Sequence, residues 1–507
     1  MSARSALLLA TLSLTACSAA ETPTPERAAT PAAAPAAAPA TASAAAPAPA
    51  SASAAASAAA PAPVPRDPNV DKLQSAAKVD SRAYDMVRSL VDEVGPRLAG
   101  SLGDKAAVAW ALRTLKDKGL DNVRAEKVMV PHWERGPESG RIVAPYAHPL
   151  ALTALGGSVG TPAKGLEGEI VMVESLDAMA AMDEAKVKGK IVFFSAPMTR
   201  TSDGSGYGKV AGVRHRGAVA AAKKGAIGVL LRSIGTDHDR LPHTGAMGYE
   251  KDVPKIPAAA LSVPDAELLA RLVGQGKPVR VSFSLGAKLL PDAESANVIG
   301  EVKGREKPDE IVLIGAHLDA WDLGQGAIDD GAGCAAVVEA ARLVLGLGTR
   351  PRRTIRVVLF ANEENGLRGA VAYAKDHAAE LDKHQLALEI DLGSGRVHTT
   401  RFLVADTSRP VAERIASLVS PLGIQYDKGP ARGGADLIPL HAAAVPIVDL
   451  HQDATKYFDV HHTANDTLDK VTKEDLDQVV GAVATVAWAA AEAPETFARV
   501  PEELRKR

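Results

Sequence analysis

The sequence predicts an α/β fold in which a mixed, largely parallel sheet is sandwiched by helices and is interrupted by an inserted β-rich domain. From about Ala296 onward, short apolar runs alternate with helix-like segments, which is typical of parallel strands covered on both faces by helices. Before that point, residues 149–285 are rich in Gly and in short β-type runs, which indicates a separate domain. The first 66 residues differ from both regions.

Length and composition agree with a folded, multi-domain protein. The chain has 507 residues, too many for one hydrophobic core and enough for two or three domains. Hydrophobic residues make up 46% and charged residues 23% of the chain, as in ordinary globular proteins. The formal net charge of -3 provides no basic surface for nucleic acid. We therefore expect no nucleic-acid partner.

The N-terminus has the form of an export signal. Arg4 precedes an apolar run over residues 6–14, and Cys17 follows Leu-Thr-Ala. That tetrapeptide resembles a bacterial lipobox, in which the cysteine is acylated after cleavage, so residues 1–17 are predicted to be a lipoprotein signal peptide with lipidation at Cys17. A plain signal peptide with an incidental cysteine is the alternative. Ser18 favours sorting to the outer membrane, on its periplasmic or cell-surface side.

The segment that follows is predicted to be a tether. Residues 18–66 consist almost wholly of Ala, Pro, Ser and Thr without a period, and such a segment has too few large apolar side chains to form a core. No later stretch is apolar over the ~18 residues that a bilayer span requires. We expect membrane contact through the lipid anchor alone.

The remaining elements can be placed in chain order. Residues 67–148, the expected first part of the catalytic domain, contain predicted helices at 81–94 and 104–118 and a strand at 123–130. The inserted domain, 149–285, has predicted strands at 169–174, 189–195 and 227–232 and a helix at 216–224. In the second part of the catalytic domain, 286–507, the predicted strands are 311–316, 354–361, 386–391 and 445–450, and the predicted helices are 333–347, 367–377, 411–422 and 473–490.

Clusters of acidic residues and histidines lie directly after these strands or in the loops between them. They are His317-Leu318-Asp319, Asp329-Asp330, Glu363-Glu364, Asp391 and His461-His462. Singly, each has an ordinary explanation as a helix cap, a solvated turn or a surface histidine. Together they could converge at one rim of the sheet. Imidazole and carboxylate ligands suit Zn²⁺, and with only Cys17 and Cys334 in the chain a thiolate site is excluded.

These motifs resemble those of the zinc-dependent exopeptidases that include bacterial leucyl aminopeptidase and glutamate carboxypeptidase, and they are most similar to the carboxypeptidase Q group. The resemblance extends from about residue 70 to the C-terminus. It rests on His317-x-Asp319-x-Trp321-Asp322-x-Gly324-Gln325-Gly326-Ala327-x-Asp329-Asp330-Gly331, Asn362-Glu363-Glu364-x-Gly366, Glu389-x-Asp391, His461-His462-Thr463 and the segment from Gly95 to Ser101.

The resemblance implies two zinc ions per chain. His317 and Asp391 would bind one ion, Glu364 and His462 the other, and Asp329 would bridge both. Thr463, Asp466 and Thr467 after the double histidine favour His462 over His461 as the ligand.

Two further carboxylates receive catalytic roles from the same resemblance. Glu363 would be the general base that activates the attacking water. Asp319 would hold the imidazole of His317 and raise its basicity.

The inserted region resembles a protease-associated domain, on the strength of residues 187–192 and 220–230. His215, His238 and His243 in this region are interpreted as surface or loop residues.

The predicted function is hydrolysis of dipeptides, or of the N-terminal residue of short peptides, by a zinc exopeptidase. A glutaminyl-cyclase-like transferase and a non-catalytic binding protein on the same fold are the alternatives. Short peptides are the expected partners. The oligomeric state stays open, a homodimer included.

Overall fold

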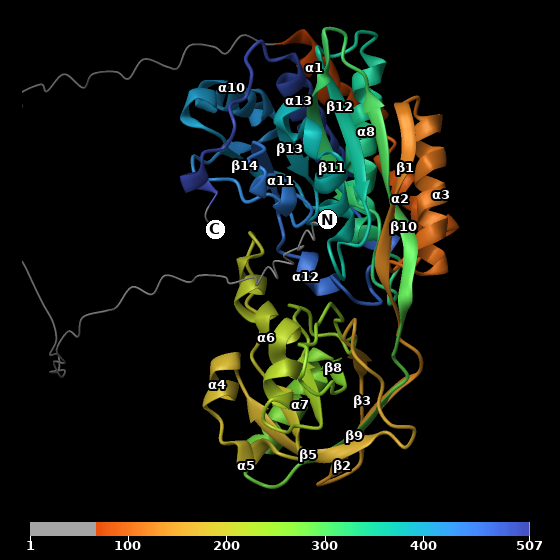
Figure 1. Cartoon of the computed structure of the whole chain (residues 1–507), viewed down its shortest axis with the longest axis vertical. Helices are drawn as coiled ribbons and strands as arrows, with labels where there is room; N and C mark the ends of the chain where they lie inside the picture. Colours follow the sequence, from red (N-terminus) through yellow and green to blue (C-terminus); the bar gives the residue numbers. More distant parts are fainter. Residues whose placement is uncertain (1–66, 506–507) are drawn as a thin grey trace, which may run out of the picture. The chain divides into compact units, whose positions relative to one another are not determined.

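The computed structural model describes residues 67–505, which form two eight-stranded sheets with their helices (Figure 1). The predicted signal peptide, Cys17 and the 18–66 segment lie outside these residues. No helix between residues 67 and 505 has the length and apolar character needed to cross a bilayer.

The helices are α1 (Pro68–Asp80), α2 (Ala83–Glu93), α3 (Leu102–Asp117), α4 (Leu176–Ala181), α5 (Glu184–Val187), α6 (Ser205–Ala222), α7 (Val263–Gly274), α8 (Ala332–Gly346), α9 (Arg368–Asp376), α10 (Arg409–Val419), α11 (Ile438–Ala442), α12 (Tyr457–Val460) and α13 (Lys473–Glu492). The strands are β1 (Asp121–Glu134), β2 (Glu138–Ala144), β3 (His148–Leu150), β4 (Leu152–Ala154), β5 (Leu166–Val173), β6 (Ile191–Phe194), β7 (Gly228–Arg232), β8 (Ala258–Leu261), β9 (Arg280–Leu285), β10 (Lys288–Val302), β11 (Lys307–His317), β12 (Arg353–Phe360), β13 (His384–Glu389), β14 (Val397–Leu403), β15 (Gln425–Tyr426) and β16 (Ile447–Gln452).

The first sheet is mixed with a parallel centre. Its strand order is β1-β10-β12-β11-β13-β16-β14-β15. The four strands β12, β11, β13 and β16 run parallel, while β10 pairs antiparallel with β12 and β14 pairs antiparallel with β16. This arrangement confirms the predicted fold class of a mixed, largely parallel sheet.

Both faces of this sheet are covered, as the sequence of β11 requires. Val312 and Ile314 belong to one hydrophobic cluster with residues of α8 and α13. Ile311 and Leu313, which point the other way, belong to a second cluster with Tyr373 of α9 and residues of α11. Because successive side chains of a strand alternate between faces, a strand buried on both sides must be continuously apolar.

Side-chain caps mark where some of the helices begin. Asp67 accepts a hydrogen bond from the Asn69 backbone at the start of α1, and Ser101 does the same for Asp104 in α3. Such caps satisfy N–H groups that have no partner inside the helix. Asp67 also accepts from the indole of Trp488, 2.9 Å away, which fastens α1 to α13.

The second sheet is built from the strands between Glu138 and Leu285, in the order β3-β2-β9-β5-β6-β7-β8-β4. Its strands β5 to β8 are parallel neighbours, and the strands at either side of them are antiparallel. A core of its own contains Phe193, Leu230 and Phe283.

The predicted helices and strands are confirmed, with bounds that shift by a few residues, and some elements were not predicted. The helix expected at 216–224 is α6, which begins much earlier, at Ser205. Helix α1 and strands β10 and β14 had no prediction. The first half of β10 is largely exposed, so its polar residues gave no hydrophobic pattern to detect.

The buried centre of β11 leads to a stability prediction. Ile314 is fully buried, so Ile314→Ala is expected to lower the free energy of unfolding by about 2–5 kcal/mol, through lost burial and the cavity left behind. Val371→Ala is the matched control, because Val371 on α9 is 56% exposed. Urea denaturation midpoints compare the two variants. Equal midpoints for both would contradict the packing described for β11.

Candidate metal centre

Asp329 lies at the middle of the clusters that follow the parallel strands. Its Oδ1 atom is 3.2 Å from Nε2 of His317, and the same nitrogen is 3.3 Å from Oδ1 of Asp391. His317 ends β11 and Asp391 follows β13, so neighbouring parallel strands deliver the two side chains to the same rim. These three residues form one group whose potential ligand atoms lie within 4.8 Å of one another.

The other oxygen of Asp329 faces a second set of side chains. Oδ2 is 3.3 Å from Nε2 of His462, and that nitrogen is 3.0 Å from Oε2 of Glu364. The carboxylate of Asp329 therefore stands between a His317–Asp391 pair and a His462–Glu364 pair. The structure brings together all of the predicted metal ligands.

The donor set fits zinc. Although His462 is near, Oδ2 of Asp329 accepts no hydrogen bond from the described part of the chain, and neither does the buried Oε1 of Glu364. Unpaired carboxylate oxygens in a buried site are costly unless a cation or a donor meets them. Burial lowers the pKa of His462 to about 4, so its imidazole is neutral at pH 7 and has a lone pair for a metal.

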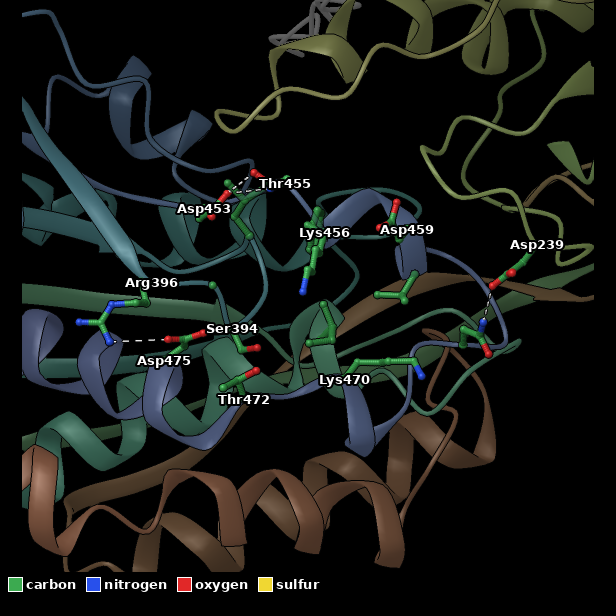
Figure 2. A pocket seen from close by; sticks show the side chains of 16 residues that line it. Asp239, Ser394, Arg396, Asp453, Thr455, Lys456, Asp459, Lys470, Thr472 and Asp475 are labelled. Atoms are coloured by element: carbon green, nitrogen blue, oxygen red, sulfur yellow. Dashed lines mark hydrogen bonds and ion pairs between the residues drawn. The ribbon is translucent and has the colours of Figure 1, made fainter.

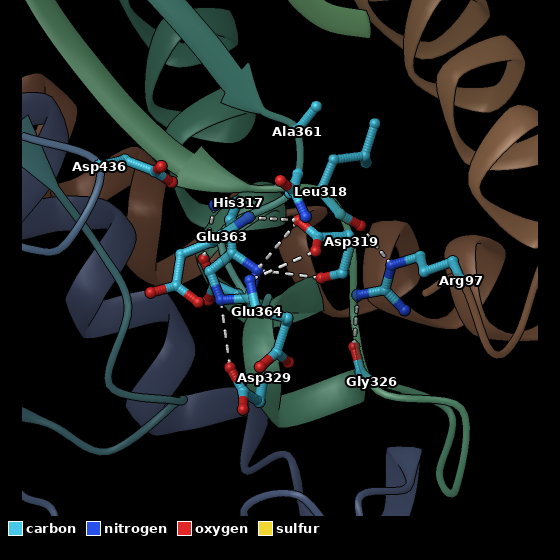
Figure 3. Close-up of polar contacts among 12 residues, drawn as sticks. Arg97, His317, Leu318, Asp319, Gly326, Asp329, Ala361, Glu363, Glu364 and Asp436 are labelled. Carbon is cyan, nitrogen blue, oxygen red and sulfur yellow. Dashed lines mark hydrogen bonds and ion pairs between the residues drawn. The ribbon is translucent and has the colours of Figure 1, made fainter. Parts of the chain in front are cut away.

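Asp319 supports the turn that carries the two glutamates (Figure 3). Its carboxylate accepts hydrogen bonds from the backbone N–H groups of Glu363, at 3.0 Å, and Glu364, at 3.4 Å. The imidazole of His317 donates through Nδ1 to the backbone oxygen of Asp319, 2.9 Å away, whereas the carboxylate is 3.9 Å from the same nitrogen. Asp319, which was expected to hold His317, therefore does so through its backbone carbonyl group. Its carboxylate instead binds the backbone of the turn at Glu363 and Glu364.

Glu363 differs from Glu364 in accessibility. The Glu363 side chain is partly exposed, while that of Glu364 is buried. Burial at the site and the nearby charge of Asp391 raise the pKa of Glu363 well above its usual value. A carboxylate with a raised pKa and contact with solvent is suited to exchange protons near neutral pH.

Arg97 holds the loop between His317 and Asp329. Its side chain is fully buried and donates to the backbone oxygens of Leu318, at 2.6 Å, and of Gln325 and Gly326, at 2.7 Å (Figure 3). A guanidinium group can satisfy several carbonyl groups at once because its donors are fixed in a plane. The Gly95–Ser101 segment singled out in the sequence thus contributes a structural residue to the site.

Asp466 fixes the backbone of Asp329 itself. Its carboxylate accepts from the N–H groups of Ile328, at 2.6 Å, and Asp329, at 3.2 Å. The peptide bond between Asp329 and Asp330 is cis. In the sequence, Asp466 and Thr467 indicate only which of two histidines is the ligand. The hydrogen bonds that Asp466 accepts from residues 328 and 329 were not predicted.

The inserted region also reaches this site. The backbone oxygen of Thr244 is 3.3 Å from Nδ1 of His462, which leaves Nε2 directed at Glu364 and Asp329. Trp321 packs edge-on against the His462 ring at 5.7 Å, and a side chain at Gly156 would collide with that indole. Support of a ligand through its second ring nitrogen orients it and tunes its basicity.

His243 differs from the sequence-based expectation, whereas His461 bears on the expected choice of His462 as the ligand. His243, interpreted as a surface or loop residue, is 1% exposed, and its ring nitrogens lie 2.7 Å from the backbone oxygen of His461 and 2.7 Å from Asp237. His461 stacks on His462 with ring centroids 3.5 Å apart, but its Nε2 is 3.7 Å from Asp329 and it makes no described contact with Glu364. The geometry therefore favours His462 as the ligand.

A pocket of about 540 Å³ lies among the loops that follow β13 and β16 (Figure 2). Ile328 and Leu392, neighbours of Asp329 and Asp391, line its apolar part. Its polar rim includes the Arg396–Asp475 ion pair. The loops after β13 and β16 form much of this pocket, so its shape depends on loop residues that carry no sequence motif.

Comparison with known proteins agrees with the site. Residues 297–487 match the sequence model of the family described as Peptidase family M28. The chain is 37% identical to mouse carboxypeptidase Q over 424 residues, which covers 83% of this chain and 88% of the mouse protein. It is 36% identical to human carboxypeptidase Q over 422 residues, with the same coverage.

Solved structures give the same result. The crystal structure of a peptidase M28 precursor from Shewanella amazonensis SB2B has a TM-score of 0.84 and 49% identity, covering 85% of this chain and 98% of that one. A zinc aminopeptidase from Bacillus subtilis shares the fold with a TM-score of 0.59 and 21% identity, covering 84% and 98%. The chain belongs to peptidase family M28 and is a zinc-dependent exopeptidase.

Proposed function

We propose that this enzyme binds two zinc ions per chain and hydrolyses dipeptides or the N-terminal residue of short peptides. His317 and Asp391 would hold one ion, Glu364 and His462 would hold the other, and Asp329 would serve as a ligand to both. The observation that carries this assignment is the placement of Asp329, whose two oxygens face the two pairs from opposite sides at 3.2 and 3.3 Å.

The catalytic roles follow from charge and accessibility. Bound zinc supplies a Lewis acid that polarises the scissile carbonyl group and makes a water molecule acidic enough to attack it at neutral pH. Glu363 accepts the proton of that water and delivers it to the nitrogen of the leaving amine as the C–N bond breaks. Asp319 keeps Glu363 in place through the backbone hydrogen bond at 3.0 Å.

The surroundings of the site suit short substrates. The pocket in Figure 2 offers space for one substrate side chain, and its lining residues Ile328 and Leu392 are the sequence neighbours of Asp329 and Asp391. On the side of His462, residues 244 and 321 close the site. We assign the inserted region as a protease-associated domain that restricts access, and move its start from the predicted residue 149 back to Glu138, because β2 and β3 belong to the second sheet. The residues before Glu138 and after Leu285 are the two parts of the catalytic domain.

The enzyme is proposed to act outside the cytoplasm, tethered to a membrane by lipid on Cys17. The support is the export-type N-terminus and the lipobox-like tetrapeptide. A single acyl chain gives only marginal anchoring, whereas the several chains of a lipoprotein hold stably. The Ala/Pro-rich segment 18–66 would let the catalytic domain reach substrates away from the bilayer.

The two alternatives from the sequence are set aside. Relatives that match most of the chain include the mouse carboxypeptidase Q and an aminopeptidase of Bacillus subtilis, which favours peptide hydrolysis over cyclisation. A non-catalytic binding protein is excluded because the chain is a zinc-dependent exopeptidase that retains Glu363 at a solvent-accessible place beside the proposed ligands.

The two-zinc assignment predicts a metal stoichiometry. Protein purified from residue 66 onward is expected to contain close to two zinc ions per chain by elemental analysis. Chelation should abolish dipeptide hydrolysis, and added zinc should restore it, because both ions orient or polarise the substrate. Full activity at a stoichiometry near one would contradict the bridging role of Asp329.

Substitutions at the adjacent glutamates separate the base from the ligand. Glu363→Gln should retain both zinc ions while kcat falls by about 10²- to 10⁴-fold, because an amide preserves the shape but cannot accept a proton. Glu364→Gln should weaken the binding of one zinc ion, because a neutral amide oxygen is a poorer ligand than a carboxylate.

Each of these variants is the control for the other, and zinc content is measured alongside the rates. If Glu363→Gln loses zinc while Glu364→Gln keeps it, the two roles are exchanged. A fully active Glu363→Gln enzyme would show that another group is the base.

The lipid anchor predicts a change in fractionation. Cys17→Ser should release the full chain from the membrane fraction and leave kcat/KM for dipeptides unchanged, since the acyl chains provide the anchor and the tether has no part in catalysis. Ser18→Ala, which retains the cysteine, is the control. A Cys17→Ser protein that still pellets with membranes would refute the lipoprotein assignment.

A further inference from the structure

Arg214 on α6 carries a buried positive charge that has no carboxylate partner within residues 67–505. The residue is 4% exposed. Within residues 67–505 its guanidinium group makes one hydrogen bond, from Nη2 to the hydroxyl oxygen of Tyr207, and no ion pair, while its Nε atom is buried without an acceptor. A buried guanidinium normally pairs with an anion, because the cost of removing it from water is otherwise not offset.

This charge lies beside the metal centre. The guanidinium group packs against the backbone of Gly245, where an added Cβ atom would be 2.4 Å from Nη1. Gly245 follows Thr244, whose carbonyl oxygen supports the ring of His462. The unpaired cation is therefore one residue away from a direct support of a proposed zinc ligand.

Tyr207 connects Arg214 to the same place from another direction. Its ring lies under the guanidinium group at 5.3 Å and stacks on Phe458 at 5.0 Å. Its edge meets His461 at 5.3 Å, and His461 stacks on His462. Because the phenol oxygen accepts from Arg214, its own O–H group remains free to donate to a ligand.

The two donors suit a carboxylate. Planar guanidinium groups bind carboxylates through parallel hydrogen bonds, and a buried pair of this kind is stronger than one in water. No carboxylate within residues 67–505 pairs with Arg214, and a bound substrate can supply one. In a short peptide held for cleavage, the C-terminal residue places a carboxylate within a few bonds of the scissile carbonyl group.

We propose that Arg214, assisted by Tyr207, binds a carboxylate of the substrate residue that follows the scissile bond. This inference rests on the proposed exopeptidase function and adds the group that selects the substrate. Arg214 could instead have a purely structural role and fasten Tyr207 and Gly245 to α6. Such a role does not depend on the charge of the substrate, so its loss would affect charged and uncharged substrates equally.

The test compares alanyl-alanine with alanyl-alanine amide, which differ only in the terminal charge. The wild-type enzyme is expected to hydrolyse the free acid with a kcat/KM about 100-fold higher than that of the amide. Arg214→Met should lose most of the activity toward the acid, chiefly through KM, and stay within about threefold of wild type on the amide. Arg216→Met, an exposed position on the same helix, should match wild type on both.

Two further measurements keep the result independent of how well Arg214→Met folds. Tyr207→Phe keeps the ring that stacks on Phe458 and should reduce the preference for the acid by about tenfold. Calorimetric titration of the zinc-loaded Glu363→Gln protein, which turns substrate over slowly, should show tighter binding of the acid than of the amide. Alanyl-glutamate amide identifies the source of the carboxylate: good hydrolysis of this peptide assigns Arg214 to an acidic side chain, and poor hydrolysis assigns it to the terminal carboxylate.

The outcomes separate this inference from the function on which it rests. Equal hydrolysis of acid and amide by wild type, or an equal loss on both substrates in a folded Arg214→Met protein, would overturn the role of Arg214 and leave the exopeptidase intact. Absence of zinc-dependent hydrolysis of either peptide by wild type, together with equal calorimetric affinities, would overturn both.

Discussion

Three carboxylates lie close together in a largely buried site, those of Asp329, Glu364 and Asp391. The rest of the site holds them in this arrangement. Like charges at such distances repel one another, and burial raises the cost of ionising them. Imidazole rings and a bound cation relieve that cost. The backbone of the loop before Asp329 is held by a different group. Arg97 donates hydrogen bonds to carbonyl oxygens within residues 318–326 and so fixes this loop.

The parallel centre of the first sheet provides the geometry for this cluster. Because β11, β12 and β13 run in the same direction, the residues that follow them emerge at a common rim. Residues at that rim are held by short loops whose backbone N–H groups are capped by carboxylates, as Asp319 caps the turn of Glu363 and Asp466 caps Asp329. Rigid strands thus set the positions, and the caps set the orientations.

The second sheet is part of the site rather than an appendage to it. Thr244 supports His462, His243 supports His461, and Gly156 leaves room for the indole of Trp321. These contacts join groups far apart in sequence, and they explain why an unpaired cation on α6 can lie next to a proposed zinc ligand. Under the proposals made above, catalysis and selection of the substrate belong to different parts of the chain, with Glu363 in one and Arg214 in the other.

The sequence by itself determined the order of strands and helices in the C-terminal half, and it singled out the histidines and carboxylates, such as His317 and Asp329, that the structure brings together. It could do so because a strand buried on both faces must be apolar, and because the clusters stand at strand ends. It did not reveal β10, whose exposed half carries no apolar pattern, or the roles of His243, Asp466 and Arg214. Those roles arise from contacts between residues that are distant in the chain, such as Asp466 with Ile328 and His243 with His461. The local sequence pattern predicts which face of each segment is buried. Only the tertiary structure decides which polar groups from distant segments come into contact.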